Sequence, residues 1–216
     1  MTSREDILRR ILDCGITAIV RVDTSEGLMP VVEALDRGGV NVVEITMTTP
    51  NALEIIRQAR LNFGDRILLG AGTVLDPETA RAAILAGADF IVSPITDART
   101  IRLVHRYSKV MMPGAFTPTE VVRAWELGAD VVKIFPTSSV GPEYIRDLKG
   151  PLPHVRMIPT GGVTLETAAD FLRAGACALA VGGNLVKKQL VAQGRYDEIT
   201  ELARKFVSIV REVRGA

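Results

Sequence analysis

Short apolar runs alternate with longer amphipathic stretches along the whole chain. The runs are brief, are bounded by Gly, Pro or Asp, and are mostly β-branched where they are longest. Continuous rather than alternating hydrophobicity is typical of strands buried on both faces, as in a parallel sheet. The predicted strands are Ile16–Val20, Val40–Ile45, Ile67–Leu69, Phe90–Val92, Val110–Met112, Val131–Ile134, Val155–Ile158 and Leu179–Val181.

Amphipathic stretches such as Ser25–Arg37 and Pro77–Ala86 have the apolar spacing of helices. Several of the predicted helices end in a glycine and a small residue before the next strand, which indicates repeated βα units. Thr117 to Glu120 has the pattern of a capping box with a proline at the first helical position. The predicted N-caps are Thr24, Thr49, Asp76, Asp97, Thr117 and Thr164.

The pattern predicts an α/β protein with a (β/α)₈ TIM-barrel fold. Eight strands in 216 residues give about 27 residues per βα unit, which suits a small barrel. We expect one domain over residues 1–216, with an N-terminal capping helix at about residues 3–14 and a last helix over Tyr196–Val213. An open doubly wound sheet is the alternative, but the first strand is followed by Arg21-Val22-Asp23 and not by a glycine-rich fingerprint.

Composition and charge exclude several classes of protein. With 47% hydrophobic and 24% charged residues, the chain is neither disordered nor collagen-like. Its net charge of +1 gives no electrostatic footprint for binding nucleic acid or a membrane surface. Cys14 and Cys177 can form neither a disulfide framework nor a four-ligand zinc site. Without a signal peptide or an apolar stretch of membrane-spanning length, a soluble cytoplasmic protein is expected.

In a barrel, catalytic residues collect where the strands end and the βα loops begin. Lys133 lies in an otherwise apolar strand, where an unpaired ammonium is costly to bury. It is either paired with a carboxylate in a structural network, or a neutral amine that can form a Schiff base. Glu44 ends another strand at the same rim. It either neutralises Lys133 or Arg21, or acts as a general acid/base.

Two glycine pairs follow the last two predicted strands, in Thr160-Gly161-Gly162 and Gly182-Gly183-Asn184. Glycines there either make tight turns or expose N–H groups to a phosphate or another anion, and two pairs favour the anion. Arg21 could hold a carboxylate bidentately, or pair with Asp23 or Glu44. No motif indicates a metal, so a metal-dependent mechanism is disfavoured.

Motifs on successive strands resemble one known family over nearly the whole chain. They are Val43–Thr46, Gly70–Val74, Phe90–Pro94, Met112–Gly114, Lys133–Pro136 and Pro159–Val163. Together they closely resemble the 2-keto-3-deoxy-6-phosphogluconate (KDPG)/4-hydroxy-2-oxoglutarate (KHG) aldolase family. The resemblance implies a class I aldolase, usually a homotrimer, that needs no metal or organic cofactor. Its reaction releases pyruvate from a 2-keto-4-hydroxy acid, together with glyceraldehyde 3-phosphate or glyoxylate.

The resemblance also implies roles for single residues. Lys133 would form the Schiff base with the C2 keto group, and Glu44 would be the acid/base. Thr73 and Pro94 would line the pyruvyl end, and Phe135 would pack beside the lysine. Thr160, Gly161 and Gly162 would hold the distal hydroxyl or phosphate region. The full predicted substrate-binding set is Arg21, Thr73, Pro94, Phe135, Thr160, Gly161, Gly162, Gly182, Gly183 and Asn184.

Two positions depart from the family pattern. Many members carry a carboxylate-binding arginine where this chain has Thr48, and we expect Arg21 to take over the carboxylate from the neighbouring strand. The Gly-Gly-Ser phosphate loop of many members reads Gly182-Gly183-Asn184 here. Because asparagine can still donate to a phosphate, a phosphorylated 2-keto acid is the expected substrate, although Asn184 could equally meet a hydroxyl or a carboxylate.

Three alternatives stay open beside this function. The substrate could be the galactonate epimer, 2-keto-3-deoxy-6-phosphogalactonate, because one sequence does not fix which face of the aldehyde is used. A phosphate-binding barrel with isomerase or synthase activity would share the glycine loops, but it would need further carboxylates or a cysteine at the rim. A non-catalytic sugar-acid binding barrel is disfavoured by the presence of both Lys133 and Glu44.

Overall fold

The computed structural model describes residues 3–21 and 27–215, which form an α/β fold with parallel sheets. One sheet has the order β5-β4-β3-β2-β1-β9 and the other the order β6-β7-β8. The strands are β1 (Ile16–Val20), β2 (Val42–Thr46), β3 (Leu68–Gly72), β4 (Phe90–Val92), β5 (Val110–Met112), β6 (Gly114–Ala115), β7 (Val132–Ile134), β8 (Met157–Pro159) and β9 (Leu179–Val181).

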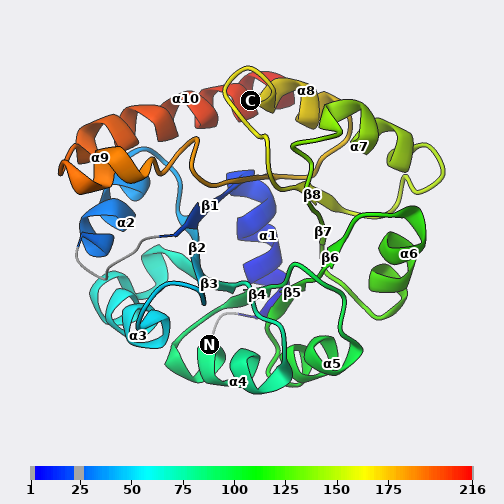
Figure 1. The fold of residues 1–216 in the computed structure, drawn as a ribbon, viewed down its shortest axis with the longest axis horizontal. Coiled ribbons are helices and arrows are strands. Elements are labelled where there is room, and N and C mark those ends of the chain that lie inside the picture. The colour runs from blue at the N-terminus through cyan, green and yellow to red at the C-terminus, as the bar shows by residue number, and fades with distance from the viewer. Residues whose placement is uncertain (1–2, 22–26, 216) are drawn as a thin grey trace.

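Helices surround the strands, and one of them, α1, lies behind the centre of the ring that the strands form (Figure 1). The helices are α1 (Arg4–Cys14), α2 (Leu28–Arg37), α3 (Ala52–Phe63), α4 (Pro77–Ala86), α5 (Ala98–Arg106), α6 (Pro118–Glu126), α7 (Gly141–Lys149), α8 (Ala168–Arg173), α9 (Lys188–Ala192) and α10 (Tyr196–Arg214), and a 3₁₀ turn, η1, spans Gly64–Arg66. No helix within the described ranges is long and apolar enough to cross a membrane.

The two sheets are joined at both ends. Only Pro113 separates β5 from β6, and its carbonyl accepts a hydrogen bond from the Lys133 N–H of β7 (2.9 Å). At the other end, Thr160 forms a parallel bridge with Ala180, and the Cys177 N–H donates to the Met157 carbonyl (2.9 Å). Hydrogen bonds and one bridge therefore link the two sheets at both junctions.

The observed strands differ from the predicted ones mainly at their ends. The runs predicted at Ile16–Val20, Phe90–Val92, Val110–Met112 and Leu179–Val181 have the observed bounds. Strand β3 extends to Gly72, beyond the predicted end at Leu69, because backbone pairing continues through glycines that carry no apolar signal. The prediction also missed β6 as a separate strand. Pro113 interrupts the pairing there, since it has no N–H to donate.

The predicted helix starts are partly confirmed. The N-caps at Asp76, Asp97 and Thr117 are observed, the last as a capping box with Glu120. The predictions for α3 and α8 were wrong, because the N-cap residues are Asn51 and Thr167 and not Thr49 and Thr164. Both predicted threonines accept a hydrogen bond in the turn that precedes the helix. The Ala52 N–H donates to the Thr49 carbonyl, and the Thr167 N–H donates to the Thr164 hydroxyl. The predicted N-cap Thr24 lies outside the described residues.

Strand alternation divides the apolar side chains into an outer and an inner core. On β1, Ile16, Ala18 and Val20 belong to the core that the outer helices cover, whereas Ile19 packs against the inner one. Ile7 and Ile11 of α1 are fully buried in the inner core. Helix α1 thus fills one end of the ring of strands and leaves the other end for a site.

Candidate active site

Glu44 lies on the inner side of β2 and is 1% exposed. It alternates with Val43 and Ile45, which belong to the outer core. On the neighbouring strand, Gly72 leaves the space that the Glu44 carboxyl occupies. Burial raises the pKa of Glu44, and the positive charges of Lys133 and Arg21 oppose that rise only in part. The carboxyl is therefore more readily protonated than an exposed glutamate.

Lys133 lies on β7, 6% exposed, at the same end of the ring. Its Nζ lies 5.3 Å from the centre of the Phe135 ring, an arrangement that allows a cation–π contact. Within the described part of the chain, no carboxylate lies within 4 Å of this amine. The interpretation of Lys133 as one member of a tight structural ion pair therefore has no support from the geometry.

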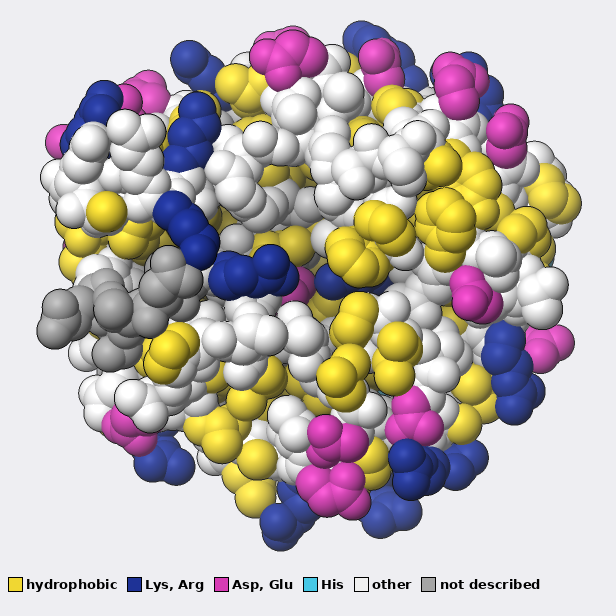
Figure 2. All heavy atoms as spheres, in the orientation of Figure 1, with side chains coloured by type: hydrophobic (Ala, Val, Ile, Leu, Met, Phe, Trp, Pro, Cys, Tyr) yellow, Lys and Arg dark blue, Asp and Glu magenta, His cyan; other side chains and the backbone are white. Residues whose placement is uncertain are grey.

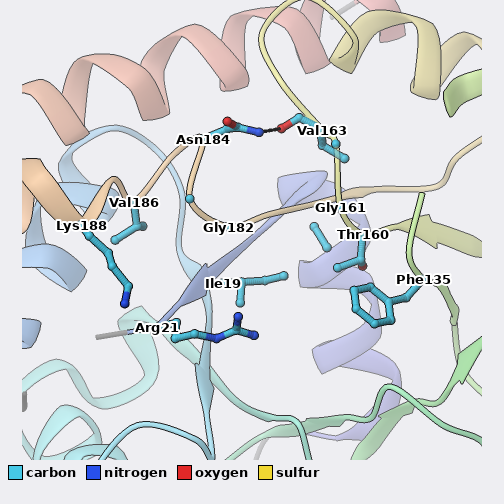
Figure 3. Close-up of a pocket in the computed structure, with 13 residues that line it drawn as sticks. Ile19, Arg21, Phe135, Thr160, Gly161, Val163, Gly182, Asn184, Val186 and Lys188 are labelled. Carbon is cyan, nitrogen blue, oxygen red and sulfur yellow. Dashed lines mark hydrogen bonds between the residues drawn. The ribbon is translucent and has the colours of Figure 1, made fainter. Parts of the chain in front are cut away.

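A cavity of about 260 Å³ opens beside Phe135. Figure 3 shows Arg21 and Lys188 on one side of it and Thr160 and Phe135 on the other. Lys and Arg side chains also border the hollow at the centre of this face, with an acidic side chain between them (Figure 2). The predicted residues that line the cavity are Arg21, Phe135, Thr160, Gly161, Gly162, Gly182, Gly183 and Asn184.

The other predicted residues lie outside the lining of this cavity. Pro94 lines a neighbouring hollow with Gly114, and Phe135 borders both spaces. Thr73 follows β3 directly and has a positive φ of 59°, which a β-branched residue adopts only under strain. Such strain is characteristic of functional positions.

The two glycine pairs differ in whether the backbone conformation requires glycine. Gly161 and Gly162 have φ values of 96° and 72°, so glycine suits the turn itself. At Gly182 and Gly183, φ is not in the left-handed range, and a Cβ on Gly183 would meet nothing within 4 Å. Neither turn geometry nor packing therefore explains the absence of a side chain at Gly183, whereas a ligand that approaches the backbone would.

The Gly182 loop is tied to the Gly161 loop through one hydrogen bond. The Asn184 side-chain amide donates to the Val163 carbonyl at 2.8 Å (Figure 3). The backbone N–H groups of Gly183 and Asn184 make no hydrogen bond to any residue that the structure describes. These two donors at the rim of the cavity are available to an anion.

Thr48 lies where many family members have a carboxylate-binding arginine, and its uncharged side chain does not replace that arginine. Its side chain is exposed, and its hydroxyl lies 3.1 Å from the buried Thr46 hydroxyl. Arg21 lines the cavity, and its positive charge acts on Glu44, the acid/base candidate. Arg21 therefore places a cation close to Glu44 at the cavity.

Sequence reasoning missed several residues of the site. Gly72 gave no signal of its own, because the contact with Glu44 depends on strand register. The exposed Lys188, to which no motif in the sequence points, lines the cavity together with the apolar residues Ile19 and Val186. Ile19 could have been found, since it lies two residues from Thr17 and therefore on the same inner face of β1.

Comparison with known proteins identifies the chemistry associated with this arrangement. The family model described as "Aldolase: KDPG and KHG aldolase" matches residues 7–202. A 2-dehydro-3-deoxy-phosphogluconate aldolase of Haemophilus influenzae is 31% identical, and the match covers 96% of this chain and 98% of that protein. A 2-dehydro-3-deoxy-6-phosphogalactonate aldolase of Escherichia coli is 35% identical, with 91% and 95% covered.

One solved structure similar to this chain holds pyruvate bound covalently. The KDPG aldolase of Legionella pneumophila, with pyruvate captured as a covalent carbinolamine intermediate, superposes with a TM-score of 0.85. It is 25% identical, and the match covers 92% of this chain and 96% of that one.

Proposed function

Because the chain belongs to the KDPG and KHG aldolase family, we propose that it cleaves 2-keto-3-deoxy-6-phosphogluconate to pyruvate and glyceraldehyde 3-phosphate, with Lys133 as the Schiff-base lysine. The same chemistry would cleave 4-hydroxy-2-oxoglutarate to pyruvate and glyoxylate. The protein is thus a carbon–carbon lyase. The observation that supports Lys133 most directly is a buried amine near a buried carboxyl, without an ion pair within 4 Å between them.

The reaction begins when the Lys133 amine attacks the C2 keto group of the substrate. Loss of water from the carbinolamine gives a protonated imine, which withdraws electrons from the C3–C4 bond. Glu44 accepts the proton of the C4 hydroxyl as this bond breaks, so C4 leaves as an aldehyde and C3 remains in an enamine. Protonation of C3 and hydrolysis of the imine then release pyruvate and restore the free lysine.

The raised pKa of Glu44 suits both directions of proton transfer. A carboxyl with an ordinary pKa is almost entirely ionised near neutral pH and is a poor donor. Burial shifts Glu44 toward the protonated form, so it can accept a proton during cleavage and return one to C3. The reacting end of the substrate would lie between Lys133 and Glu44, with Thr73 and Pro94 lining the pyruvyl group and Phe135 packing beside the lysine.

The two anionic ends of the substrate are assigned to different parts of the cavity. Arg21 holds the carboxylate, because a guanidinium matches a carboxylate bidentately and Arg21 faces the Glu44 side of the site. The backbone N–H groups of Gly183 and Asn184 hold the phosphate, with Lys188 on the same cavity wall. Thr160, Gly161 and Gly162 line the distal hydroxyl and phosphate region between these ends.

The galactonate epimer is a second candidate substrate. The 35% identity to a 2-dehydro-3-deoxy-6-phosphogalactonate aldolase supports it as strongly as the matches to gluconate aldolases support KDPG. The two substrates differ only in the configuration at C4. Cleavage rates measured with each pure epimer distinguish them, and the faster reaction identifies the natural configuration.

We further assign the two sheets to a single closed (β/α)₈ barrel, in which β5 and β6 form one strand interrupted at Pro113. Hydrogen bonds from Lys133 and Cys177 across the two junctions support this closure. The family resemblance supports a homotrimer, which sedimentation of the purified protein tests. The two free cysteines, Cys14 and Cys177, suit a reducing cytoplasm.

The experiment that tests the aldolase mechanism is trapping with borohydride. The protein is incubated with pyruvate and reduced, and the modified peptide is located by mass spectrometry. We expect one pyruvate-derived adduct on Lys133 and none in Lys133→Ala, whereas Lys205→Ala, which alters an exposed lysine of α10, reacts like the wild type. A folded wild-type protein without an adduct at high pyruvate would rule out class I chemistry.

A further inference from the structure

Two buried hydroxyls inside the ring of strands have no partner in the protein. Thr17 on β1 is 1% exposed and Thr160 after β8 is 5% exposed. The Oγ1 atom of each makes no hydrogen bond to any residue that the structure describes. Buried hydroxyls are ordinarily hydrogen-bonded, and each exception requires an explanation. A valine would fill the same volume without a polar atom, so a hydroxyl at these positions points to a partner outside the chain.

Both side chains face the interior, Thr160 at the substrate cavity and Thr17 beneath it. Thr17 alternates with Ile16 and Ala18 of the outer core, and Ile19, two residues further along β1, lines the cavity. Thr160 lines the same cavity directly, near Phe135 (Figure 3). Thr17 therefore lies deeper inside the ring of strands than Ile19, which is two residues further along β1 and forms part of the cavity wall.

Strand register brings the two threonines to the same level. Ala180 of β9 pairs with Thr17 on one side and with Thr160 on the other. Adjacent strands are about 4.8 Å apart, so two threonines separated by one strand have Cα atoms about 10 Å apart. Side chains that converge toward the axis bring the hydroxyls closer together than the Cα atoms, and a water that makes two hydrogen bonds of about 2.8 Å can bridge such a gap.

Ala180 leaves room between the two hydroxyls. It belongs to the inner core and lines the cavity, and its methyl group is the smallest side chain that a strand residue other than glycine can place there. A polar site that offers two or more hydrogen-bonding groups is the kind that retains a buried water.

We propose that one water molecule bridges Thr17 and Thr160 beneath the substrate, and that Thr17 is through this water a positioning residue for the aldol reaction. This inference rests on the proposed function, and it takes the hydroxyl that Thr160 meets on its side of the cavity to be the one on C4. The water donates to Thr160 Oγ1 and occupies one of its lone pairs, so the Thr160 proton is directed at the C4 oxygen. That donor stabilises the C4 oxygen as it becomes the carbonyl of the aldehyde product, and it fixes the configuration accepted at C4.

The test compares Thr17→Val with Thr17→Ser. Imine formation is measured separately in each variant by pyruvate trapping on Lys133. Thr17→Val keeps the side-chain volume and removes the hydroxyl, and Thr17→Ser keeps the hydroxyl. We expect Thr17→Val to lower kcat for cleavage about tenfold and to increase the fraction of the minor C4 epimer formed from pyruvate and D-glyceraldehyde 3-phosphate. Thr17→Ser should stay close to the wild type in both, and pyruvate trapping on Lys133 should be unchanged in both variants.

A double mutant separates positioning from a general loss of structure. If Thr17 acts only through Thr160, Thr17→Val has no further effect on kcat or on the epimer ratio in a Thr160→Val protein. A Thr17→Val enzyme with wild-type kcat and epimer ratio would overturn the proposal while leaving the aldolase function intact, whereas failure of pyruvate trapping in the wild type would overturn the function itself. If Thr17→Val does not fold, Thr17→Ala provides the same comparison.

The water itself can be observed directly. A crystal structure of the wild-type protein at high resolution is expected to show one ordered water within hydrogen-bond distance of both hydroxyls, and the Thr17→Val structure to lack it. A dry, collapsed interior between the two threonines would rule out the bridge.

Discussion

The Glu44 carboxyl occupies the space that a side chain on Gly72 would need. A Cβ atom built on Gly72 would lie 1.8 Å from Glu44 Oε1 and 2.4 Å from its Cδ atom. Strands β2 and β3 are paired in parallel, with Glu44 beside Gly70 and Thr46 beside Gly72. The glycine therefore determines where the proposed acid/base can place its carboxyl.

Gly72→Ala should impair catalysis while the protein still folds. The φ of Gly72 is not in the left-handed range, so alanine is compatible with the backbone, and the displaced group is the end of a flexible side chain. Because Glu44 must move by more than 1 Å, we expect kcat to fall about 100-fold. Steady-state cleavage assays measure this effect, and pyruvate trapping on Lys133 should persist.

Gly150→Ala is the matched control for this variant. Gly150 lies at the end of α7 in a right-handed helical conformation, and its nearest non-adjacent atom would be 3.4 Å from the new Cβ. Alanine there should leave kcat unchanged and raise the free energy of unfolding by about 0.5 kcal/mol. Equal activity of Gly72→Ala and the wild type would contradict the assigned relationship between Gly72 and Glu44.

The sequence pattern predicted the positions of most strands well, because parallel strands buried on both faces are continuous in hydrophobicity. It singled out Lys133 and Glu44 because a charged residue inside an apolar run can be recognised from the sequence alone. It could not predict the contact between Gly72 and Glu44, which depends on the register of two strands. Nor did it distinguish Gly161, which the backbone requires, from Gly183, which the backbone does not.

Glu44→Gln should raise the stability of the protein near pH 7.5 and lower its activity. The folded-state pKa of Glu44 is raised by burial, so folding favours its protonated form. The corresponding stabilisation is complete below the unfolded pKa of 4.5 and is lost as pH rises through the folded pKa. Near pH 7.5 the uncharged glutamine avoids the cost of a buried charge, and we expect Glu44→Gln to unfold at higher urea than the wild type there.

The same substitution should lower kcat by about 10²- to 10⁴-fold, because it removes the acid/base group. Urea unfolding at pH 4 and pH 7.5 checks the sign of the stability effect, and the gain should disappear at the lower pH. A variant that is less stable than the wild type at pH 7.5 would show that the Glu44 carboxylate stabilises the fold, contrary to the direction of its pKa shift.

Asp130 should be a source of acid lability at the end of the molecule that α1 closes. Arg4 Nε donates to Asp130 Oδ1 at 2.8 Å, and the Met111 N–H donates to Oδ2 at 2.8 Å. Burial alone would raise the pKa of Asp130, but the His105 imidazole 3.5 Å away and the hydrogen bonds from Arg4 and Met111 outweigh it and lower the pKa below 3.8. The stabilisation is therefore present above pH 3.8 and is lost as pH falls through the folded pKa.

Asp130→Asn should lower the free energy of unfolding by about 2 kcal/mol at neutral pH, and the difference from the wild type should shrink as pH falls below 4. Glu143→Gln is the control, because its ion pair with Arg146 is exposed on α7 and should contribute less than about 0.5 kcal/mol. Chemical unfolding at several pH values measures both. Equal effects of the two substitutions would contradict a structural role for Asp130.

Gly183→Ala tests whether the glycine loop binds phosphate. The added methyl group meets no protein atom within 4 Å, so folding should be unaffected. It should obstruct a phosphate that approaches the Gly183 and Asn184 N–H groups. We expect KM for KDPG to rise about tenfold, while KM for the unphosphorylated 4-hydroxy-2-oxoglutarate stays constant. An equal rise for both substrates would place the obstruction elsewhere than at a phosphate.

Arg21→Met should weaken binding of the substrate carboxylate. Pyruvate contains the carboxylate and the keto group but no phosphate, so its trapping on Lys133 isolates this one interaction. Loss of a charge-assisted bidentate contact of about 2–3 kcal/mol should raise the half-saturating pyruvate concentration about 30- to 150-fold. Arg21→Lys should restore part of the affinity, because it keeps the charge without the planar fork. If pyruvate saturates Arg21→Met as it does the wild type while KM for KDPG rises, Arg21 binds the phosphate and not the carboxylate.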